Sequence, residues 1–305
     1  MPEPKLQFVA FLSNVDGSIT SLKLGDGFRI RHMTEEMGIA LISKLEGVGP
    51  EMAYERAEAQ YACLNRKEHR FYVAMKTYQP SAGQLSAMAN DEIPDMTLML
   101  IDTYKLTTKL SLARLYQEGD IRAPLSYGMV IDQMELKRVL KGFATNTILS
   151  RVPYVINPED AENIGEFIRT TELKSFQQYV LTAFRDFEES YSTHSEGQAL
   201  TSLMAAVESL LHGTYAERVS EEIANNCALL LGTNPEERSS MYSEVKRLYS
   251  KRSLILHGKP QVVTKDDIIL LRNYVRRAIK ELASTGIGKQ QLIDSLRSKQ
   301  GSRAA

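Results

Sequence analysis

Two residues near the end of one predicted helix have side chains that suit phosphodiester chemistry. Arg252 and His257 lie five positions apart in the segment from Pro235 to Gly258. A guanidinium can hold a scissile phosphate and stabilise the charge that develops on it, while an imidazole can move the proton. His257 lies in the last predicted turn, where the carbonyl end of the helix favours the protonated ring. Arg252 and His257 are therefore the candidate catalytic pair.

Arg252 lies on the apolar side of that helix, which is an unusual place for a charge. At 100° per residue it falls within a stripe formed by Met241, Val245, Leu248, Tyr249, Ile255 and Leu256. A buried cation is costly unless it is paired or lies at an interface with polar groups. The stripe therefore predicts a homodimer through this helix, in which two copies share a polar cleft around Arg252 and His257. The alternative is an ion pair within the chain, to Glu208 or Glu244.

Several further residues are candidates for supporting or RNA-binding roles. Ser253, Tyr249 and Glu208 are the supporting candidates. The candidate RNA-binding residues are cations near the pair or on the next helix: Lys251, Lys259, Arg272, Arg276 and Lys280. The last three recur every four residues, which predicts a basic stripe that could follow an RNA backbone. A merely solvated helix face is an equal alternative.

No metal site is expected. Glu208 and His212 have the i, i+4 spacing that could share a metal on a helix, but no third ligand accompanies them. Pairing with an arginine inside a helical bundle is the preferred role for Glu208. The two cysteines, Cys63 and Cys227, form no CxxC or Cys/His pattern and indicate ordinary buried thiols.

The segment Leu248-Tyr-Ser-Lys-Arg-Ser-Leu-Ile-Leu-His-Gly258 resembles the HEPN superfamily, whose nuclease motif is an arginine, four to six residues, and then a histidine. The resemblance is closest to the ApeA-like branch, in which Tyr-x-x-Arg-Ser-x-x-x-His-Gly occurs at this place. Ala206-Val-Glu-Ser-Leu-Leu-His-Gly213 is similar to an earlier helix of that branch. The likeness extends over about 172–284, which is under half of the chain.

The resemblance implies a metal-independent endoribonuclease without a cofactor, acting as a homodimer in which Arg252 and His257 of both subunits line one cleft. The 2′-hydroxyl of the RNA would attack the phosphate and leave a 2′,3′-cyclic phosphate and a 5′-hydroxyl. A bacterial stress or antiphage effector is one biological setting. The alternative is a non-catalytic HEPN scaffold that binds RNA or a protein partner.

Two positions depart from the pattern of that superfamily. Active members often have Asn, Asp or His directly after the motif arginine, whereas this chain has Ser253, a weaker orienting group. The toxin branch that is modified by a nucleotidyltransferase antitoxin has a tyrosine two places after the histidine, where Lys259 stands here. The toxin branch is therefore disfavoured.

The elements that must position these residues are predicted from helix caps. Ser195-x-x-Gln198 and Thr214-x-x-Glu217 have the form of capping boxes, and the first precedes an apolar face from Leu200 to Leu211. Asn234-Pro235-Glu-Glu predicts the start of the helix that carries Arg252, and Thr264 to Asp267 begins another that reaches about Ser284. These patterns indicate an antiparallel bundle, at 172–286, followed by a C-terminal helix and frayed basic tail at 287–305.

The first half of the chain predicts an α+β domain at 1–152. Short strands are expected at Leu6–Leu12, Ser18–Leu24, Phe28–His32 and Arg70–Tyr78, and helices at Glu35–Leu45 and Met96–Tyr116. A connecting segment with a short helix follows at 153–171. The half contains no phosphate loop, GxGxxG, GxSxG or HExxH, so its role is open; an unidentified regulator is one possible partner.

The amino-acid composition limits the classes of protein to which this chain can belong. The 305 residues are 43% hydrophobic and 25% charged, typical of a globular protein, and no run is apolar enough to predict a membrane span or a secretory signal. A cytoplasmic location is expected. The net charge of -1 hides an asymmetry, because Lys246 to Ala305 holds 14 Lys and Arg against 4 Asp and Glu. This surplus is compatible with RNA as a partner.

Overall fold

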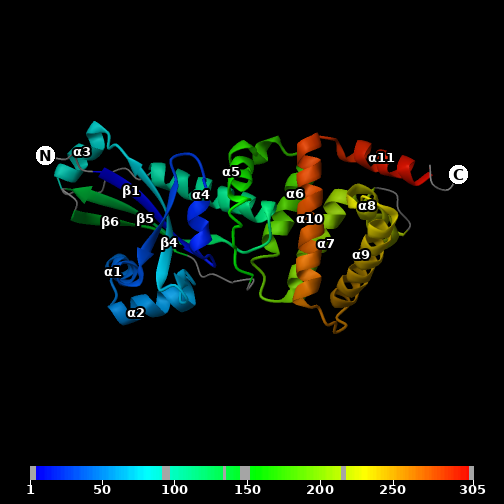
Figure 1. Ribbon diagram of the computed structural model, residues 1–305, viewed down its shortest axis with the longest axis horizontal. Coiled ribbons are helices and arrows are strands. Elements are labelled where there is room, and N and C mark those ends of the chain that lie inside the picture. Colours follow the sequence, from blue (N-terminus) through cyan, green and yellow to red (C-terminus); the bar gives the residue numbers. More distant parts are fainter. Residues whose placement is uncertain (1–4, 91–96, 133–134, 145–151, 214–217, 302–305) are drawn as a thin grey trace. The chain divides into compact units, whose positions relative to one another are not determined.

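The computed structural model describes residues 5–90, 97–132, 135–144, 152–213 and 218–301. The chain divides into two compact units, Met1–Thr171 and Glu172–Ala305. The first contains a sheet with helices, and the described part of the second is helical (Figure 1). The fold is therefore a mixed α+β one.

The sheet of the first unit is antiparallel, with its strands in the order β2-β4-β1-β5-β6. Its strands are β1 (Lys5–Ser13), β2 (Arg29–Thr34), β4 (Arg70–Tyr78), β5 (Arg122–Asp132) and β6 (Glu135–Ala144), and the short β3 (Leu64–Asn65) pairs with the start of β4. The central strand β1 places Val9 opposite Met75 of β4 and opposite Tyr127 of β5. The outer side of β2 has no neighbouring strand within the described ranges.

Helices cover the sheet because its strands are apolar on both faces. The unit contains α1 (Glu35–Glu46), α2 (Pro50–Glu55), the π-helical turn η2 (Arg56–Gln60), α3 (Ala82–Ala89), α4 (Thr97–Tyr116) and α5 (Ala161–Thr170). On one face Val9, Phe11 and Phe71 pack with Leu41 and Ile42 of α1, and α2 and η2 add Ala53 and Ala57. The helix α4 contacts β1 and β5.

The strands at Leu6–Leu12, Phe28–His32 and Arg70–Tyr78 are confirmed within a few residues, as are both predicted helices. The strand predicted at Ser18–Leu24 is wrong, because Gly17–Ser21 forms the 3-10 helix η1, in which the Asp16 carboxylate accepts the N–H of Ser18 at 3.0 Å. No element was predicted over Arg122–Ala144, where β5 and β6 lie. Pro124 and Gly128 interrupt the alternation that identifies a strand.

The described part of the second unit consists of helices. They are the short η3 (Leu173–Ser175), α6 (Gln178–Glu189), α7 (Glu196–Leu211), α8 (Val219–Leu231), α9 (Pro235–Leu256), α10 (Lys265–Thr285) and α11 (Lys289–Gly301). Of these, α7, α9 and α10 begin with a capping side chain. The helix α10 packs against α6, α7 and α8, and its buried side chains include Leu271, Val275 and Ile279. The predicted apolar face of α7 is confirmed, since Leu200, Leu203 and Leu210 are fully buried.

Three predicted helix starts can be compared with the observed caps. The hydroxyl of Ser195 accepts the N–H of Gln198, although the Gln198 side chain returns to the N–H of His194. Asn234 caps α9, and Thr264 with Asp267 forms a full capping box for α10. The capping box predicted at Thr214–Glu217 lies outside the described residues. The prediction that the tail frays from Ser298 is wrong as far as Gly301, because α11 continues to that residue.

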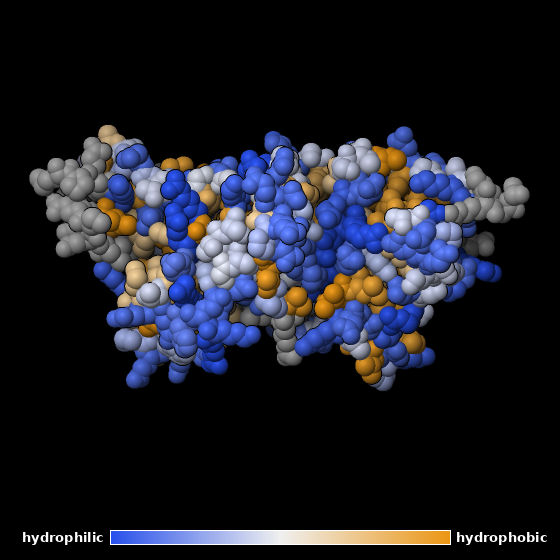
Figure 2. Space-filling model, viewed as in Figure 1, coloured by the Kyte–Doolittle hydropathy of each residue, from blue (hydrophilic) through white to orange (hydrophobic). Residues whose placement is uncertain are grey.

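No helix in the described ranges is both long enough and apolar enough to cross a membrane. Most of the visible face is hydrophilic, and several separate hydrophobic patches lie on it (Figure 2). Among the exposed large apolar residues, Leu256 and Val262 lie close in sequence to His257.

Candidate functional site

The candidate site lies at the C-terminal end of α9. Met241, Val245 and Leu248 are buried, and α9 contacts α7 and α8. The helix ends at Leu256, and Gly258 adopts a φ of 71°, which glycine tolerates without strain. In this turn the N–H of Lys259 donates to the carbonyl of Leu254 at 2.9 Å. The local sequence thus fixes where the helix stops and holds His257 at its end.

Arg252 is paired within the chain. Its Nη2 lies 3.3 Å from Oε2 of Glu208 on α7, and the two side chains are 19% and 27% exposed. The guanidinium also lies 5.7 Å from the centre of the Tyr249 ring, within the range of a cation–π contact. Arg252 Nε is buried and has no hydrogen-bond partner. One amino group of the guanidinium is thus engaged, while Nη1 makes no hydrogen bond within the described part of the chain.

Tyr249 completes this cluster, which we call the Arg252 cluster (Glu208, Tyr249 and Arg252). Partial burial raises the pKa of Tyr249, and the negative charge of Glu208 raises it further. The phenol therefore stays protonated and can donate a hydrogen bond. The supporting candidates Tyr249 and Glu208 are thus brought together with Arg252.

His257 is exposed at the C-terminal end of α9. Its backbone N–H donates to the carbonyl of Ser253 at 3.2 Å, so Ser253 takes part in ending the helix. The ring makes no hydrogen bond or ion pair with any residue that the structure describes, and it is not joined to Arg252. The imidazole is therefore free to meet a ligand from solvent.

The two lysines beside the pair differ. Lys259 is exposed. Lys251 is instead engaged inside the unit, because its Nζ lies 2.7 Å from the carboxylate of Asp267 and 2.8 Å from the carbonyl of Val262. Its amine therefore links α9 to the start of α10, and the contact of Lys251 with RNA stays a prediction.

Asp267 was not predicted as part of the site's support. It accepts hydrogen bonds from Lys251 and from Arg247, the latter at 2.8 Å, and it also caps α10. Burial acts to raise the pKa of its carboxyl, but these charged donors outweigh burial and hold the pKa well below its usual range. The capping pattern identified this residue in the sequence, but its ion pairs depend on tertiary contacts.

The basic stripe on α10 does not form an RNA surface. Arg272 and Arg276 are each only 3% exposed. Arg272 donates to the carbonyl of Ser190 at 2.6 Å and lies 3.8 Å from the centre of the Tyr191 ring, while Arg276 donates to the Tyr191 hydroxyl at 3.2 Å. Both the predicted RNA-binding role and the solvated alternative are wrong for these residues, because the stripe faces α6.

Lys280 continues this inward face. Burial lowers the pKa of its amine, and the positive charges of Arg276 and Arg277 lower it further. A lysine so placed contributes less positive charge to the surface than the sequence suggests. The position of Lys280 therefore gives no support to the prediction that this residue contacts RNA.

His212 and Glu208 do not form a shared site. The ring of His212 lies 3.0 Å from the carboxylate of Glu222 on α8, which also accepts the N–H of Gly213. The described residues contain no group of three or more His, Cys, Asp or Glu side chains placed to hold a metal ion.

The argument for a dimer drawn from the apolar stripe is weakened. Met241, Val245 and Leu248 pack within their own unit, and Glu208 supplies the internal partner for Arg252. The charge of Arg252 among apolar residues is therefore compensated inside the chain, and no interface is needed to explain it. Leu256, which is 55% exposed, is the part of the stripe that remains open to solvent.

Comparison with protein-family models, with curated proteins and with solved structures finds no match for this chain. The chemistry of the site therefore rests on its own residues and on their arrangement at the end of α9.

Proposed function

We propose that the second unit is a HEPN-like bundle and that the protein is a metal-independent endoribonuclease. The observation that carries this proposal is the placement of an exposed His257 at the same helix end as the partly exposed Arg252. Among the residues that the structure describes, neither the His257 ring nor Arg252 Nη1 has a hydrogen-bond partner. The resemblance of Leu248–Gly258 to the HEPN nuclease motif supplies the reaction class.

In the proposed reaction the 2′-oxygen of the RNA forms a bond to the adjacent phosphorus, and the bond from phosphorus to the 5′-oxygen breaks. The 2′-hydroxyl loses its proton to a base and the departing 5′-oxygen gains one from an acid. His257 fits one of these roles, and His257 of a second copy in a homodimer fits the other. Arg252 stabilises the negative charge on the phosphate through the N–H groups that Glu208 leaves free.

A non-catalytic scaffold that binds RNA or a protein is the second candidate function. The specific observation in its favour is the ion pair between Arg252 and Glu208, which neutralises the guanidinium within the bundle. In that case Arg252 stabilises the contact between α9 and α7, and His257 only ends the helix.

The deciding experiment is incubation of the purified protein with cellular RNA in EDTA, followed by mapping of the cut ends. Cleavage that survives chelation and leaves 5′-hydroxyl and 2′,3′-cyclic phosphate ends is expected. Loss of cleavage on chelation would contradict the proposed mechanism.

His257→Ala is expected to lower the cleavage rate by roughly 10² to 10⁴, the usual contribution of an acid-base group. His194→Ala is the matched control, because His194 is another exposed histidine of the same unit outside the site. Both variants should keep the unfolding free energy within about 0.5 kcal/mol of the wild type. An unchanged rate in His257→Ala would favour the scaffold.

A further inference from the structure

The helices α1 and α2 of the first unit form an open groove of about 880 Å³. They contact each other and lie on one face of the sheet (Figure 1). On each helix the residues that line the groove recur at i, i+1, i+4 and i+5, so they occupy one side of α1 and one side of α2. The groove is therefore bounded by the sides of two helices that belong to one unit.

Half of the lining is made of the side chains of Ile39 and Ala40 on α1 and of Pro50 and Tyr54 on α2. Ile39 and Tyr54 are half-buried and pack against the core of the unit, whereas Ala40 and Pro50 are exposed. Because Ala40 is small, a partner can approach α1 closely at this point. A partner that covers these side chains gains free energy by removing apolar surface from water.

The other half of the lining is acidic, with Glu35 and Glu36 on α1 and Glu51 and Glu55 on α2. The carboxylate of Glu35 lies 2.8 Å from the ring of His69. The other three carboxylates make no hydrogen bond or ion pair with any residue that the structure describes. The lining itself, all of which is described, contains no Lys, Arg or His.

The two arginines that follow in the sequence do not neutralise these carboxylates. Arg56 Nη1 lies 2.6 Å from Oε2 of Glu46, and Arg66 pairs with Glu58. Both of these glutamates lie outside the lining. The groove therefore keeps a local negative charge, which attracts a cationic partner and repels RNA.

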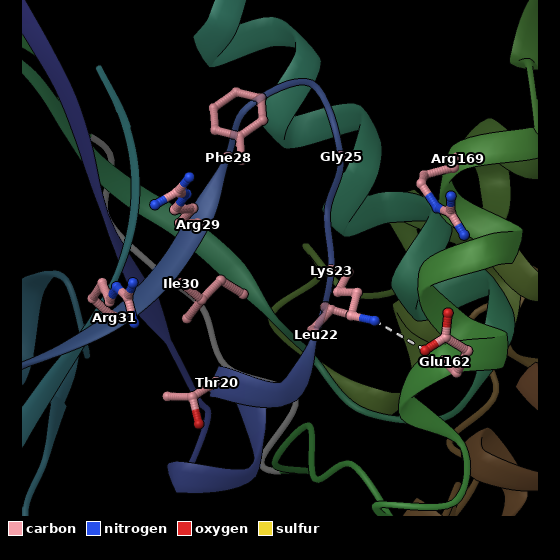
Figure 3. Close-up of a pocket in the computed structure, with 10 residues that line it drawn as sticks. All are labelled: Thr20, Leu22, Lys23, Gly25, Phe28, Arg29, Ile30, Arg31, Glu162 and Arg169. Carbon is pink, nitrogen blue, oxygen red and sulfur yellow. Dashed lines mark hydrogen bonds and ion pairs between the residues drawn. The ribbon is translucent and has the colours of Figure 1, made fainter.

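A concavity of about 490 Å³ beside β2 does not concentrate charge in this way. Figure 3 shows Arg29 and Arg31 projecting from the side of β2 opposite to Ile30. Both guanidiniums point away from Lys23 and Arg169, so these cations cannot contact one small ligand together. In the groove, by contrast, the carboxylates flank one apolar surface.

The walls of the groove favour a helical occupant. The sides of two helices present few free backbone groups, because helical N–H and C=O groups bond within the helix. An extended peptide would therefore find few backbone partners, whereas a helix satisfies its own. An amphipathic helix can lay an apolar stripe on Ile39, Ala40 and Tyr54, with Lys and Arg beside that stripe reaching the carboxylates.

We propose that this α1–α2 groove binds a basic amphipathic helix of a partner protein. The open apolar side chains supply the area to be buried, and the three unpaired carboxylates select positive charge. A small polyamine would meet the carboxylates but would leave most of the apolar side chains uncovered. The groove is independent of the proposed RNA cleavage, because it involves no residue of the second unit.

The test is titration of the full chain with two synthetic peptides of about 14 residues, or four helical turns. One carries leucines on one side of the helix and lysines on the other, and the second has the same composition in an order that disperses the leucines. A single tryptophan in each peptide reports binding by its fluorescence, since the chain itself contains none. The amphipathic peptide is expected to bind at least tenfold more tightly. Equal affinities, or no saturable binding of either peptide, would overturn the proposal.

Competition separates a helix from a small cation as the ligand. Spermidine should displace the amphipathic peptide no better than sodium chloride of equal ionic strength, because it cannot replace the apolar contacts. Better displacement by spermidine would show a site for a small cation and would contradict the proposed helix.

Ala40→Lys is expected to weaken binding of the amphipathic peptide at least tenfold, since it places a cation and a long side chain in the groove. Alanine and lysine both favour helices, so α1 should keep its structure, which circular dichroism checks. Ala82→Lys is the matched control, because Ala82 is an exposed alanine of α3 outside the groove. An unchanged affinity in Ala40→Lys would place the peptide elsewhere and would contradict the proposed site.

Glu51→Gln with Glu55→Gln should weaken binding about tenfold, because two of the unpaired carboxylates are lost. Glu159→Gln with Glu166→Gln is the matched control, since it removes two exposed carboxylates of the same unit outside the groove. The control should bind as the wild type does. An equal loss of affinity in both double variants would show non-specific attraction to negative charge and would refute the groove as the binding site.

Discussion

The helices α9 and α10 both place arginines on largely apolar faces, but the structure uses these arginines in different ways. On α10, Arg272 is 3% exposed, bonded to Ser190 and stacked on the Tyr191 ring. On α9, the Arg252 side chain is 19% exposed and has one carboxylate partner and unused N–H groups. An arginine whose donors are satisfied inside the protein stabilises the fold, whereas Arg252 keeps donors that a ligand can use.

The position of His257 sharpens this contrast. The exposed ring of His257 lies just beyond the end of α9, at the helix end that carries Arg252. Arg272 and Arg276 instead contact Tyr191 and Phe187 of the unit's own interior. The net positive charge of the C-terminal segment therefore overstates its basic surface, because part of that charge is buried between α10 and α6.

The largest effect on stability is expected from Arg272→Met. Methionine keeps much of the apolar volume but leaves the buried Ser190 carbonyl without this donor, so a loss of about 2 to 3 kcal/mol in unfolding free energy is expected. Arg252→Met should lose no more than about 1 kcal/mol, since its ion pair is partly exposed. Urea unfolding followed by helical circular dichroism checks both values, and equal losses would remove the distinction between the two helices.

A smaller effect, dependent on pH, is expected from Asp267→Asn, because Asp267 links α9 to α10. Its folded pKa is depressed below the unfolded value of about 3.9, so its stabilisation is fully present above about pH 4 and is lost as pH falls through the folded pKa. The variant should lose about 1 to 2 kcal/mol at pH 7.

Urea unfolding at pH 7 and at pH 3 measures this dependence. The difference between Asp267→Asn and the wild type should shrink at the lower pH. Asp266→Asn is the control, because the neighbouring carboxylate is exposed and lies in the same first turn of α10. A difference that grows as the pH falls would show that the carboxylate is not held ionised by its partners.

The smallest effect is expected from Glu208→Gln. Because both side chains of the pair are partly exposed, the coupling between Glu208 and Arg252 should be about 0.5 to 1 kcal/mol. A double-mutant cycle with Glu208→Gln and Arg252→Met measures it by urea unfolding. A coupling above about 3 kcal/mol would place Arg252 with the buried arginines of α10 and would favour a purely structural role.

Helix starts were predictable because their signals are local. Asn234, Thr264 and Ser195 accept the N–H of a residue three positions later, so a cap is contained in a few consecutive residues. The apolar face of α7 was predictable for a similar reason, since its period repeats within one helix. The strand β5 was missed because pairing with β1, and not its interrupted sequence pattern, holds it in the sheet, and β6 joins the sheet only through β5.

By itself the sequence determined the α+β class, most helix ends and the placement of Arg252 and His257 near the end of one helix. The tertiary structure decided which cations are available, because the helical period places a charge on a face but does not say what packs against that face. Glu208 reaches Arg252 across 44 positions of sequence, and Ser190 reaches Arg272 across 82. Partners so distant in the chain meet only when the helices pack, and their contacts determine whether a cation stabilises the interior or stays open to solvent.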